Sequence, residues 1–413
     1  MDRRSHSSRR HGSVSLCRKQ PAWPQTGSPE VSMRPSRLGA RKPKVNSAKA
    51  PRKRRIKFTA PQVIGFSATF AFFLLIYIIG PDFILPSQTT DAQTVADMAT
   101  NLDDISNGAG GYYYAAYLLS LLPPGGEQVL VIGVGLLFIG TVFSHTKTFP
   151  TAALASFLCT TPILMFLFAY MKDTFTPILT SIALLLLSRN RNLPITFLLV
   201  LATYISYGIF FRTYYILIAA AFAGLLIFHT SNWYFRLVLA TVALAALLLL
   251  PDAYFYELGS ARDLVNRHRP VDTLGNRTVF FNPYPPTNAL NFTINYVYAI
   301  IRLNLPFLFS FGLKESFLVI NIAIYAILVR VGFSSSHLTS KMPAILFCAH
   351  ILVLYIFEPD LGSYLRHASS ALLYLTPALT VLDKSHVSLI THRRRPRRSN
   401  KISQLSSRRH LNP

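Results

Sequence analysis

The feature that most constrains this chain is a series of ten apolar runs, each close to the length of a membrane-spanning helix. A bilayer core takes about 20 residues of α-helix, so the shorter runs are expected to extend into their flanking turns. We therefore predict an all-α fold, a polytopic membrane bundle of about ten transmembrane helices. The runs cover approximately residues 61–80, 127–145, 150–170, 174–188, 195–211, 213–228, 235–251, 315–331, 342–357 and 369–382.

The composition agrees with a membrane protein. Of 413 residues, 51% are hydrophobic and 14% are charged, whereas a soluble domain carries about a quarter charged residues. The net charge of +24 is concentrated in two tails: residues 1–57 carry 17 Lys/Arg and 2 Asp/Glu, and residues 383–413 carry 9 and 1. Both tails lack apolar periodicity and are expected to be disordered. They flank a membrane domain at 58–382 and are predicted to contact anionic lipid, not nucleic acid.

The turns between runs indicate which way the chain is oriented. With ten spans, both termini lie on one side of the membrane, and the basic tails make that side cytoplasmic. Every turn expected on the same side is basic and holds no acidic residue. These turns contain Lys147, then Arg189 and Arg191, then Arg236, then Arg330 and Lys341. The protein is therefore predicted in a plasma membrane, the inner membrane if the cell is bacterial, with both termini in the cytoplasm.

The largest segment predicted on the outer face is 252–314. It is rich in arginine, which opposes the usual bias of positive charge toward the cytoplasm. Within it, "NALNFTINYVYAIIRLNLPF" has apolar residues at helical spacing, and "YYYAAYLLSLLPP" (112–124) precedes two prolines. Both are predicted to be interfacial helices. The arginines of the large segment are Arg262, Arg267, Arg269, Arg277 and Arg302.

These arginines allow two interpretations. The simpler one is a solvated loop with internal Arg–Asp pairs. The other is an anion site, because guanidinium groups bind phosphate and diphosphate oxygens bidentately and stay charged at physiological pH. Lys172, Arg212 and Arg366 lie at outer ends of other runs, at a depth that charged side chains occupy only when they snorkel, pair or face a polar cavity.

Four further residues on the predicted outer face are candidates for proton transfer. A carboxylate or histidine near a sugar hydroxyl acts as a general base. For any one carboxylate, the simpler interpretation is a salt-bridge partner for arginine. The candidates are Asp173, Glu358, Asp360 and His367.

Taken together, the chain resembles the bacterial polysaccharide polymerases of the Wzy type, including the EpsG-like exopolysaccharide branch. The resemblance covers most of 60–382. It rests on the multispan body, a short "KD" turn, an arginine at a later outer end, the arginine-bearing loop with "NR…R…NRT", and a closing "G-x-Y-x-R-H". The corresponding residues are Lys172 and Asp173, Arg212, the segment 257–307, and Gly362, Tyr364, Arg366 and His367.

The resemblance implies a glycosyltransferase that needs neither metal nor cofactor. It would transfer a growing glycan from one undecaprenyl pyrophosphate carrier to a new lipid-linked repeat unit on the outer membrane face, alongside a flippase and a chain-length regulator. Catalytic roles are expected for Arg212, Arg366, His367, Asp173, Glu358 and Asp360. Contacts to diphosphate and glycan are expected for Lys172, Arg262, Arg267, Arg269, Arg277 and Arg302.

Two other classes of protein remain open at this point. A multispan glycosyltransferase using a polyprenyl-phosphate sugar would carry acidic residues in its first outer loop, where Asp103 and Asp104 lie. A transporter or flippase without chemistry would show internal repeats and charges near the midplane; the chain has no evident repeat. A membrane acyltransferase is disfavoured, since no histidine in an early span pairs with an acyl-donor site.

Overall fold

A computed structural model describes residues 58–80, 90–101, 110–189, 192–267, 278–335 and 338–384. The chain separates after Ile56 into two units, and all described residues belong to the second. The predicted tails lie outside these residues, except for Asp383 and Lys384. Every named element of the described part is a helix, so the all-α prediction is confirmed.

Six described helices are long and apolar enough to cross a membrane. Their presence supports a membrane protein. They are α1 (Ala60–Ile79), α5 (Gly126–Phe143), α6 (Phe149–Pro162, continued by the π-turn Ile163–Leu167), α8 (Leu193–Phe210), α13 (Leu313–Phe333) and α14 (Leu338–Phe357).

The helices α10 (Trp233–Leu249) and α11 (Asp252–Arg267) follow each other with a bend of 91° and count as a seventh span if they are taken as one broken element. By length and composition, the described helices therefore give six or seven spans, and the predicted number of about ten is not confirmed. The helices α7 (Thr176–Arg189) and α9 (Tyr214–Thr230) have 14 and 17 residues. The last predicted run is interrupted: α15 (Leu361–Ser370) is followed by the 3-10 turn Leu372–Leu375 and then by helix 376–384.

Polar caps and prolines explain where several of these helices begin. Thr59 and Gln62 form a capping box before α1, and Pro61 lies in its first turn, where its missing N–H would be unpaired in any case. Asn232 accepts a hydrogen bond from the backbone N–H of Phe235 at 2.9 Å and so caps α10. Asn288 caps α12 (Ala289–Asn304) in the same way.

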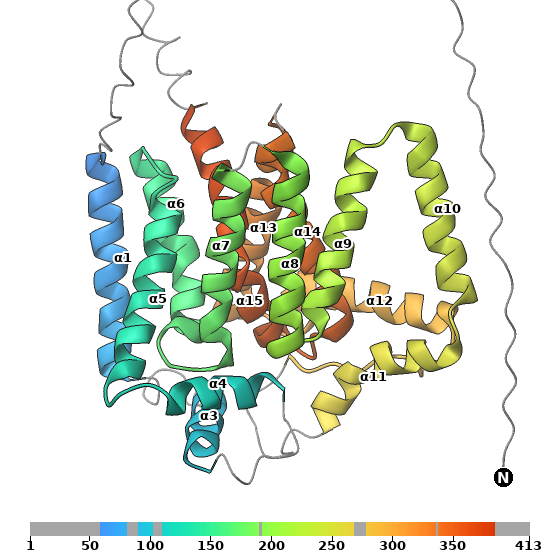
Figure 1. Ribbon diagram of the computed structural model, residues 1–413, viewed down its shortest axis with the longest axis horizontal. Helices are drawn as coiled ribbons and strands as arrows, with labels where there is room; N and C mark the ends of the chain where they lie inside the picture. The colour runs from blue at the N-terminus through green and yellow to red at the C-terminus, as the bar shows by residue number, and fades with distance from the viewer. Residues whose placement is uncertain are drawn as a thin grey trace, which may run out of the picture. The chain divides into compact units, whose positions relative to one another are not determined.

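The helices run back and forth, so that the short basic turns gather at one end of the bundle (Figure 1). This basic end comprises the α5–α6 turn, the end of α7, the start of α10, the end of α13 and the start of α14. These places carry Lys147, Arg189, Arg236, Arg330 and Lys341. The arrangement matches the alternation that the sequence predicted.

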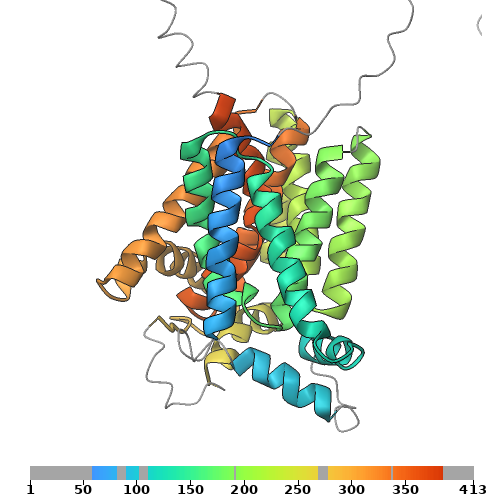
Figure 2. The same cartoon turned by 90° about the vertical axis from the view of Figure 1, so that its left-hand side faces the viewer.

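Short helices collect at the opposite end (Figures 1 and 2). They are α3 (Thr90–Thr100), α4 (Gly111–Ser120), α11 and α12. The two segments predicted to form interfacial helices are helical, as α4 and α12. In that segment, α11 and α12 pack against each other and against α14.

The centre of the bundle lies around α14. In α14, 61% of the residues in its most apolar 18-residue stretch are buried, whereas in α1, at the periphery, the share is 17%.

Asp383, near the end of the described part, links the last helix to α6. Its carboxylate accepts hydrogen bonds from the hydroxyls of Thr148 and Thr151, both at 2.7 Å.

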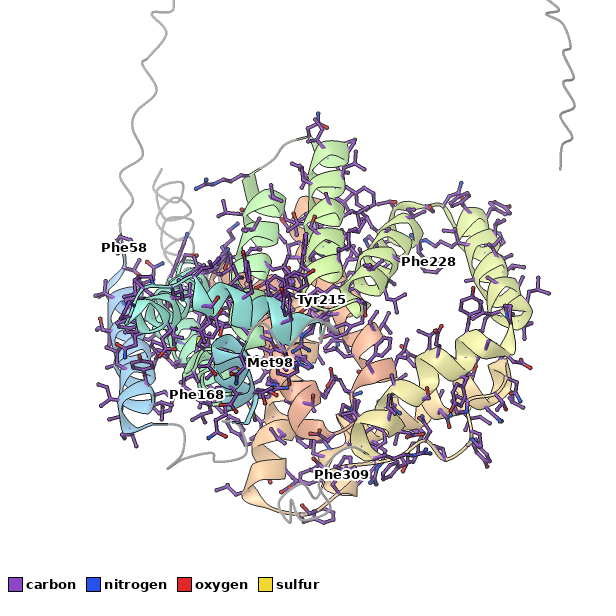
Figure 3. All side chains as sticks on the ribbon, turned by 60° about the horizontal axis from the view of Figure 1, so that its bottom comes forward. Phe58, Met98, Phe168, Tyr215, Phe228 and Phe309 are labelled. Atoms are coloured by element: carbon purple, nitrogen blue, oxygen red, sulfur yellow. The ribbon has the colours of Figure 1, made fainter. Side chains whose placement is uncertain are left out.

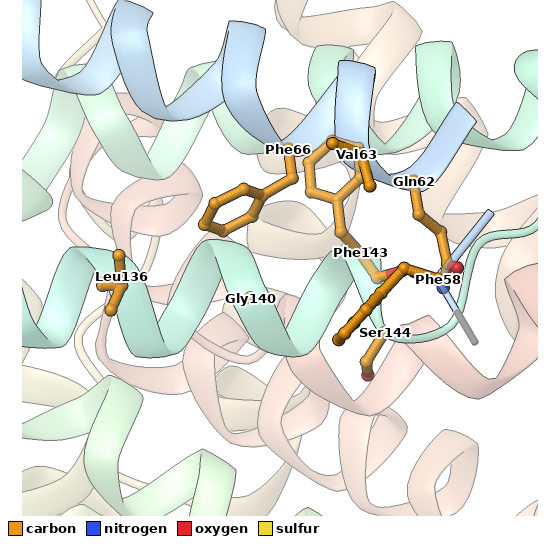
Figure 4. A pocket seen from close by; sticks show the side chains of 8 residues that line it. All are labelled: Phe58, Gln62, Val63, Phe66, Leu136, Gly140, Phe143 and Ser144. Atoms are coloured by element: carbon orange, nitrogen blue, oxygen red, sulfur yellow. Dashed lines mark hydrogen bonds between the residues drawn. The ribbon is translucent and has the colours of Figure 1, made fainter. Parts of the chain in front are cut away.

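An apolar groove of about 450 Å³ lies between α1 and α5 near the basic end (Figure 4). Gln62 crosses it to donate to the carbonyl oxygen of Phe143 at 3.1 Å. Phe66 and Gly140 form part of its wall.

Candidate functional site

Charged side chains from five separate elements meet at the end of the bundle opposite the basic end, which Figure 3 turns toward the viewer. They come from α3, from the 3-10 turn η4 (Lys172–Phe175), from the α8–α9 turn, from the end of α14 and from α15. We call the set the charged cluster. It consists of Asp91, Lys172, Asp173, Arg212, Glu358, Arg366 and His367.

Asp173 is the centre of the charged cluster and is only 2% exposed. Its carboxylate forms an ion pair with a terminal nitrogen of Arg212. On its other oxygen, Arg366 Nε lies at 3.4 Å and His367 Nε2 at 3.8 Å. Because an isolated buried carboxylate is very unfavourable, these cationic neighbours are what make the burial of Asp173 possible.

A second carboxylate, Asp91, lies at the more open edge of the charged cluster. It accepts a hydrogen bond from Arg366 at 2.7 Å and another from the hydroxyl of Tyr112. The ammonium of Lys172 lies over the ring of Tyr112, 3.5 Å from its centroid, a cation–π contact. Arg366 and Asp91 are 15% and 20% exposed, so this edge is where solvent or a ligand reaches the charges.

A pair formed by His367 and Glu358 makes up the other side of the charged cluster. His367 Nδ1 lies 2.5 Å from an oxygen of Glu358, and its Nε2 lies 2.7 Å from a terminal nitrogen of Arg212. An arginine only donates, so Nε2 accepts and Nδ1 carries the hydrogen that Glu358 receives. Arg212 also donates to the hydroxyl of Tyr214 at 2.9 Å.

The charges of the cluster control one another's protonation. Burial raises the pKa of Asp173, but the positive charges of Arg212 and Arg366 outweigh it and hold the pKa well below its usual range. Burial likewise raises the pKa of Asp91, and the charges of Arg366 and Lys172 bring it below its usual value. The contact with His367 does the same for Glu358.

Lys172 behaves in the opposite sense. Burial, reinforced by the positive charge of Arg212, lowers the pKa of Lys172 to about 8. At neutral pH, the lysine and two arginines therefore face three carboxylates.

Two donors in this arrangement make no hydrogen bond. Arg212 Nε and Arg366 Nε are buried and have no hydrogen-bond partner among the described residues. Buried donors are almost always paired, so these atoms are available to an anion that enters from outside the chain.

Two of the residues predicted for the site serve the backbone instead. Arg262 is 2% exposed. It donates to the carbonyl oxygens of Tyr355, Ile356 (3.1 Å) and Glu358 (2.9 Å) at the end of α14. Asp360 accepts the backbone N–H of Ser363 at 2.9 Å and so caps α15. They position the segment that carries Glu358 and His367, which explains their burial without a substrate.

Two further arginines of the segment 252–314 are described, Arg302 and Arg267, and both lie outside the charged cluster. Arg302 donates to the carbonyl oxygen of Leu308 at 3.0 Å and stacks 4.0 Å from the ring centroid of Phe309. Arg267 is exposed at the end of α11. Arg269 and Arg277 lie outside the described residues, as do Asp103 and Asp104.

A chain of hydroxyls and one histidine lies within the bundle between α8, α14 and the turn η6 (Leu372–Leu375). The hydroxyl of Tyr204 is 2.6 Å from His350 Nε2 and 2.5 Å from the hydroxyl of Tyr374. All three side chains are buried. These groups satisfy one another, as buried polar groups generally do.

Sequence reasoning missed three members of the site. They are Asp91, Tyr112 and Tyr214, none of which was among the candidates. Their position beside Lys172 and Arg212 depends on how the helices pack. Among the described residues, no group of three His, Cys, Asp or Glu side chains is arranged to hold a metal ion.

Comparison with protein-family models, with curated proteins and with solved structures finds no match to this chain. The class of the protein is therefore defined by its own fold and site: an all-helical membrane protein with a buried cluster of paired charges at one end of the bundle.

Proposed function

We propose that the protein is an integral-membrane polysaccharide polymerase, a glycosyltransferase that joins undecaprenyl-pyrophosphate-linked repeat units on the outer face of the plasma membrane. The observation that carries the proposal is the convergence of Lys172, Arg212 and Arg366 beside the Glu358–His367 pair at one end of a membrane bundle. Three cations and a base side by side are what the transfer of a sugar from a lipid diphosphate requires.

In the proposed reaction, the acceptor hydroxyl oxygen bonds to the anomeric carbon of the donor glycan. The bond from that carbon to the diphosphate oxygen breaks, and the diphosphate leaves with the electron pair. Arg366, Lys172 and Arg212 stabilise its charge, and a donor placed in this way is worth about 10²–10³ in rate. No metal is invoked.

His367 is the proposed base. Its Nε2 takes the proton of the acceptor hydroxyl, while Glu358 holds the ring through Nδ1 and stabilises the imidazolium. Arg212 donates to Nε2 in the structure. A diphosphate that draws Arg212 away exposes Nε2, so donor binding would prepare the base. Asp173 orients both arginines.

The proposed orientation has both termini in the cytoplasm and ten spans. Its support is that the five basic positions named above lie together at the end away from the charged cluster, in agreement with the positive-inside rule. The charged cluster then lies at the outer surface, where a flipped lipid-linked glycan presents its head group.

Lysine in place of Arg366 tests the assignment. It keeps the positive charge for Asp91 and Asp173 but loses the guanidinium fork that holds two oxygens at once. We expect polymer yield to fall by about 10²-fold, as for the loss of one transition-state donor. Polymer on gels, normalised to protein in the membrane, is the measurement. The matched control is Arg302→Lys at the same end, expected to give normal polymer; equal polymer from both variants would remove Arg366 from the site.

Lys172 predicts a dependence on pH. Its pKa is lowered to about 8, so the cation is present below pH 8 and is lost as the pH rises through that value. We expect the affinity of the protein for inorganic pyrophosphate to decrease over the same range. In Lys172→Arg, which stays charged, this decrease should be absent up to pH 10. A wild-type titration that is flat from pH 7 to pH 9 would contradict the role of Lys172.

A second candidate is a transporter of lipid-linked glycans without chemistry. It is favoured by the balance of charges in the cluster and by the buried Tyr204–His350–Tyr374 chain, since paired polar groups within a bundle also occur in proton-coupled transporters. A strain lacking the protein distinguishes the two. Lipid-linked repeat units accumulate on the outer leaflet if a polymerase is lost and on the inner leaflet if a flippase is lost.

A further inference from the structure

A cavity of about 380 Å³ adjoins the charged cluster, but no residue of the cluster lines it. Its walls come from the end of α1, from α3 and α4, from the start of α5 and from the segment just before η4. Figure 2 shows α3 below the end of α1. Ala92 in the wall directly follows Asp91, and Tyr170 precedes Lys172 by two residues. The proposed reaction makes no use of this cavity.

The cavity holds a negative charge that no described side chain neutralises. Glu127 is the only charged residue among the described residues that line it. It lies in the first turn of α5, where the helix dipole favours a carboxylate. The ion pairs of the described part do not include Glu127, and the nearby Arg212 and Arg366 are paired with Asp173 and Asp91. The cavity therefore favours a cation and repels an anion such as phosphate.

Aromatic rings form the deeper wall of the cavity. Phe168 and Tyr170 are buried, whereas Glu127 is exposed, so the charge lies nearer to solvent than these rings. The hydroxyl of Tyr170 donates to the carbonyl oxygen of Ala115 at 2.8 Å, which fixes the ring. Tyr77 of α1 is half-buried and adds a third ring. Aromatic rings attract an ammonium group and bury the carbon atoms attached to it.

Two amides complete the polar groups of the cavity. Gln93 of α3 and Gln128 of α5 line it and are exposed. An ammonium has three N–H donors and no acceptor, so the carboxylate and the two amide oxygens match it. The same end of the bundle already holds an ammonium on a tyrosine ring, since Lys172 Nζ lies 3.5 Å from the ring centroid of Tyr112. A divalent metal ion fits less well, because Ca²⁺ and Mg²⁺ take about six or more oxygen ligands.

We infer that this cavity binds a primary alkylammonium group, with the ammonium beside Glu127 and its carbon atoms on Phe168 and Tyr170. Two sources carry this chemistry, the ethanolamine head group of a phospholipid and a free amine in solution. The cavity lies at the ends of α1 and α5, two helices of membrane-spanning length, so lipid head groups lie at the same depth. The inference does not rest on the proposed function, and its failure leaves that proposal unchanged.

Glutamine in place of Glu127 tests the inference, because it keeps the size of the side chain and removes its charge. The probes are butylammonium and dihexanoyl phosphatidylethanolamine, and butanol and methyl glucoside are the uncharged comparisons. Their affinities for the full-length protein in detergent are measured by saturation-transfer NMR. We expect the affinity for butylammonium to fall about tenfold in Glu127→Gln, as for the loss of a charge-assisted hydrogen bond. Neither butanol nor methyl glucoside should bind in the same concentration range.

The matched control is Glu257→Gln, since Glu257 is also exposed and lies on α11 at the same end; it should keep the wild-type affinity. Ala96→Trp is a second variant, because Ala96 lines the cavity from α3 and is exposed. Its indole should fill the cavity and cause a similar loss while Glu127 stays in place. Tighter binding of the phospholipid than of butylammonium assigns the site to a membrane lipid, and equal binding assigns it to a free amine; both support the inference. Unchanged affinity in Glu127→Gln, binding of butanol as tight as that of butylammonium, or displacement of butylammonium by methyl glucoside would each overturn it.

Discussion

Replacement of Asp173 with asparagine is expected to destabilise the protein by about 3–5 kcal/mol, the usual cost of breaking a buried ion pair by removing one partner. Asparagine has nearly the same shape, but it leaves Arg212 and Arg366 without their shared counter-charge in a site where Asp173 is 2% exposed. The free energy of unfolding in mixed micelles is the measurement. A loss below 1 kcal/mol would mean that water, not Asp173, compensates the two guanidinium groups.

Asp97→Asn is the matched control. Asp97 lies on α3 at the same end but is exposed, so its loss should change stability by less than about 0.5 kcal/mol. The pH gives an independent check. Because the pKa of Asp173 is lowered on folding, its contribution is present above the pKa of the unfolded chain, about 3.9. It is lost as the pH falls from there through the folded value. The wild type should therefore lose stability in acid more steeply than Asp173→Asn.

Glutamine in place of His367 is expected to reduce the rate of polymer formation by about 10²–10⁴-fold, the range of general base catalysis. Glutamine still offers polar atoms to Glu358 and Arg212 but does not take up the proton of a hydroxyl. The measurement is incorporation of lipid-linked repeat units by purified protein, together with the affinity for pyrophosphate, which should stay within a few-fold of the wild type.

His145→Gln is the control, because His145 lies at the basic end, in the turn before α6. It should polymerise normally. Polymerisation by His367→Gln at the wild-type rate would assign the base to another group. Loss of both polymer and pyrophosphate binding would indicate that His367 positions Arg212 and does not transfer a proton.

The amphipathic and apolar patterns predicted much of the fold. The six long helices and the gathering of basic turns at one end were predictable, because hydropathy and charge can be read from short stretches of the sequence. The ten-span count stayed a prediction for a physical reason. A run such as 369–382 is mostly apolar, yet it contains a 3-10 turn that packs in the core, and apolarity does not distinguish a buried turn from a span.

The site was predictable only in part. The tight turns that carry Lys172, Asp173 and Arg212 were recognisable because charges beside apolar runs are costly. Their pairing with Asp91 was not, because 82 residues and several helices separate Asp91 from Asp173 in the sequence. Arg262 and Arg302 were grouped with them by residue type. The structure gives the first a role in capping α14 and stacks the second on Phe309, and neither contact has a signal in the sequence.

The grip of Arg262 on the end of α14 has a consequence for selectivity. The arginine belongs to α11, and its guanidinium donates to the carbonyl oxygen of Glu358, whose carboxylate contacts His367. In the proposed polymerase, a sugar that displaces α11 would therefore change the orientation of the proposed base. Differences among repeat units should then appear in the speed of each addition as much as in the tightness of binding.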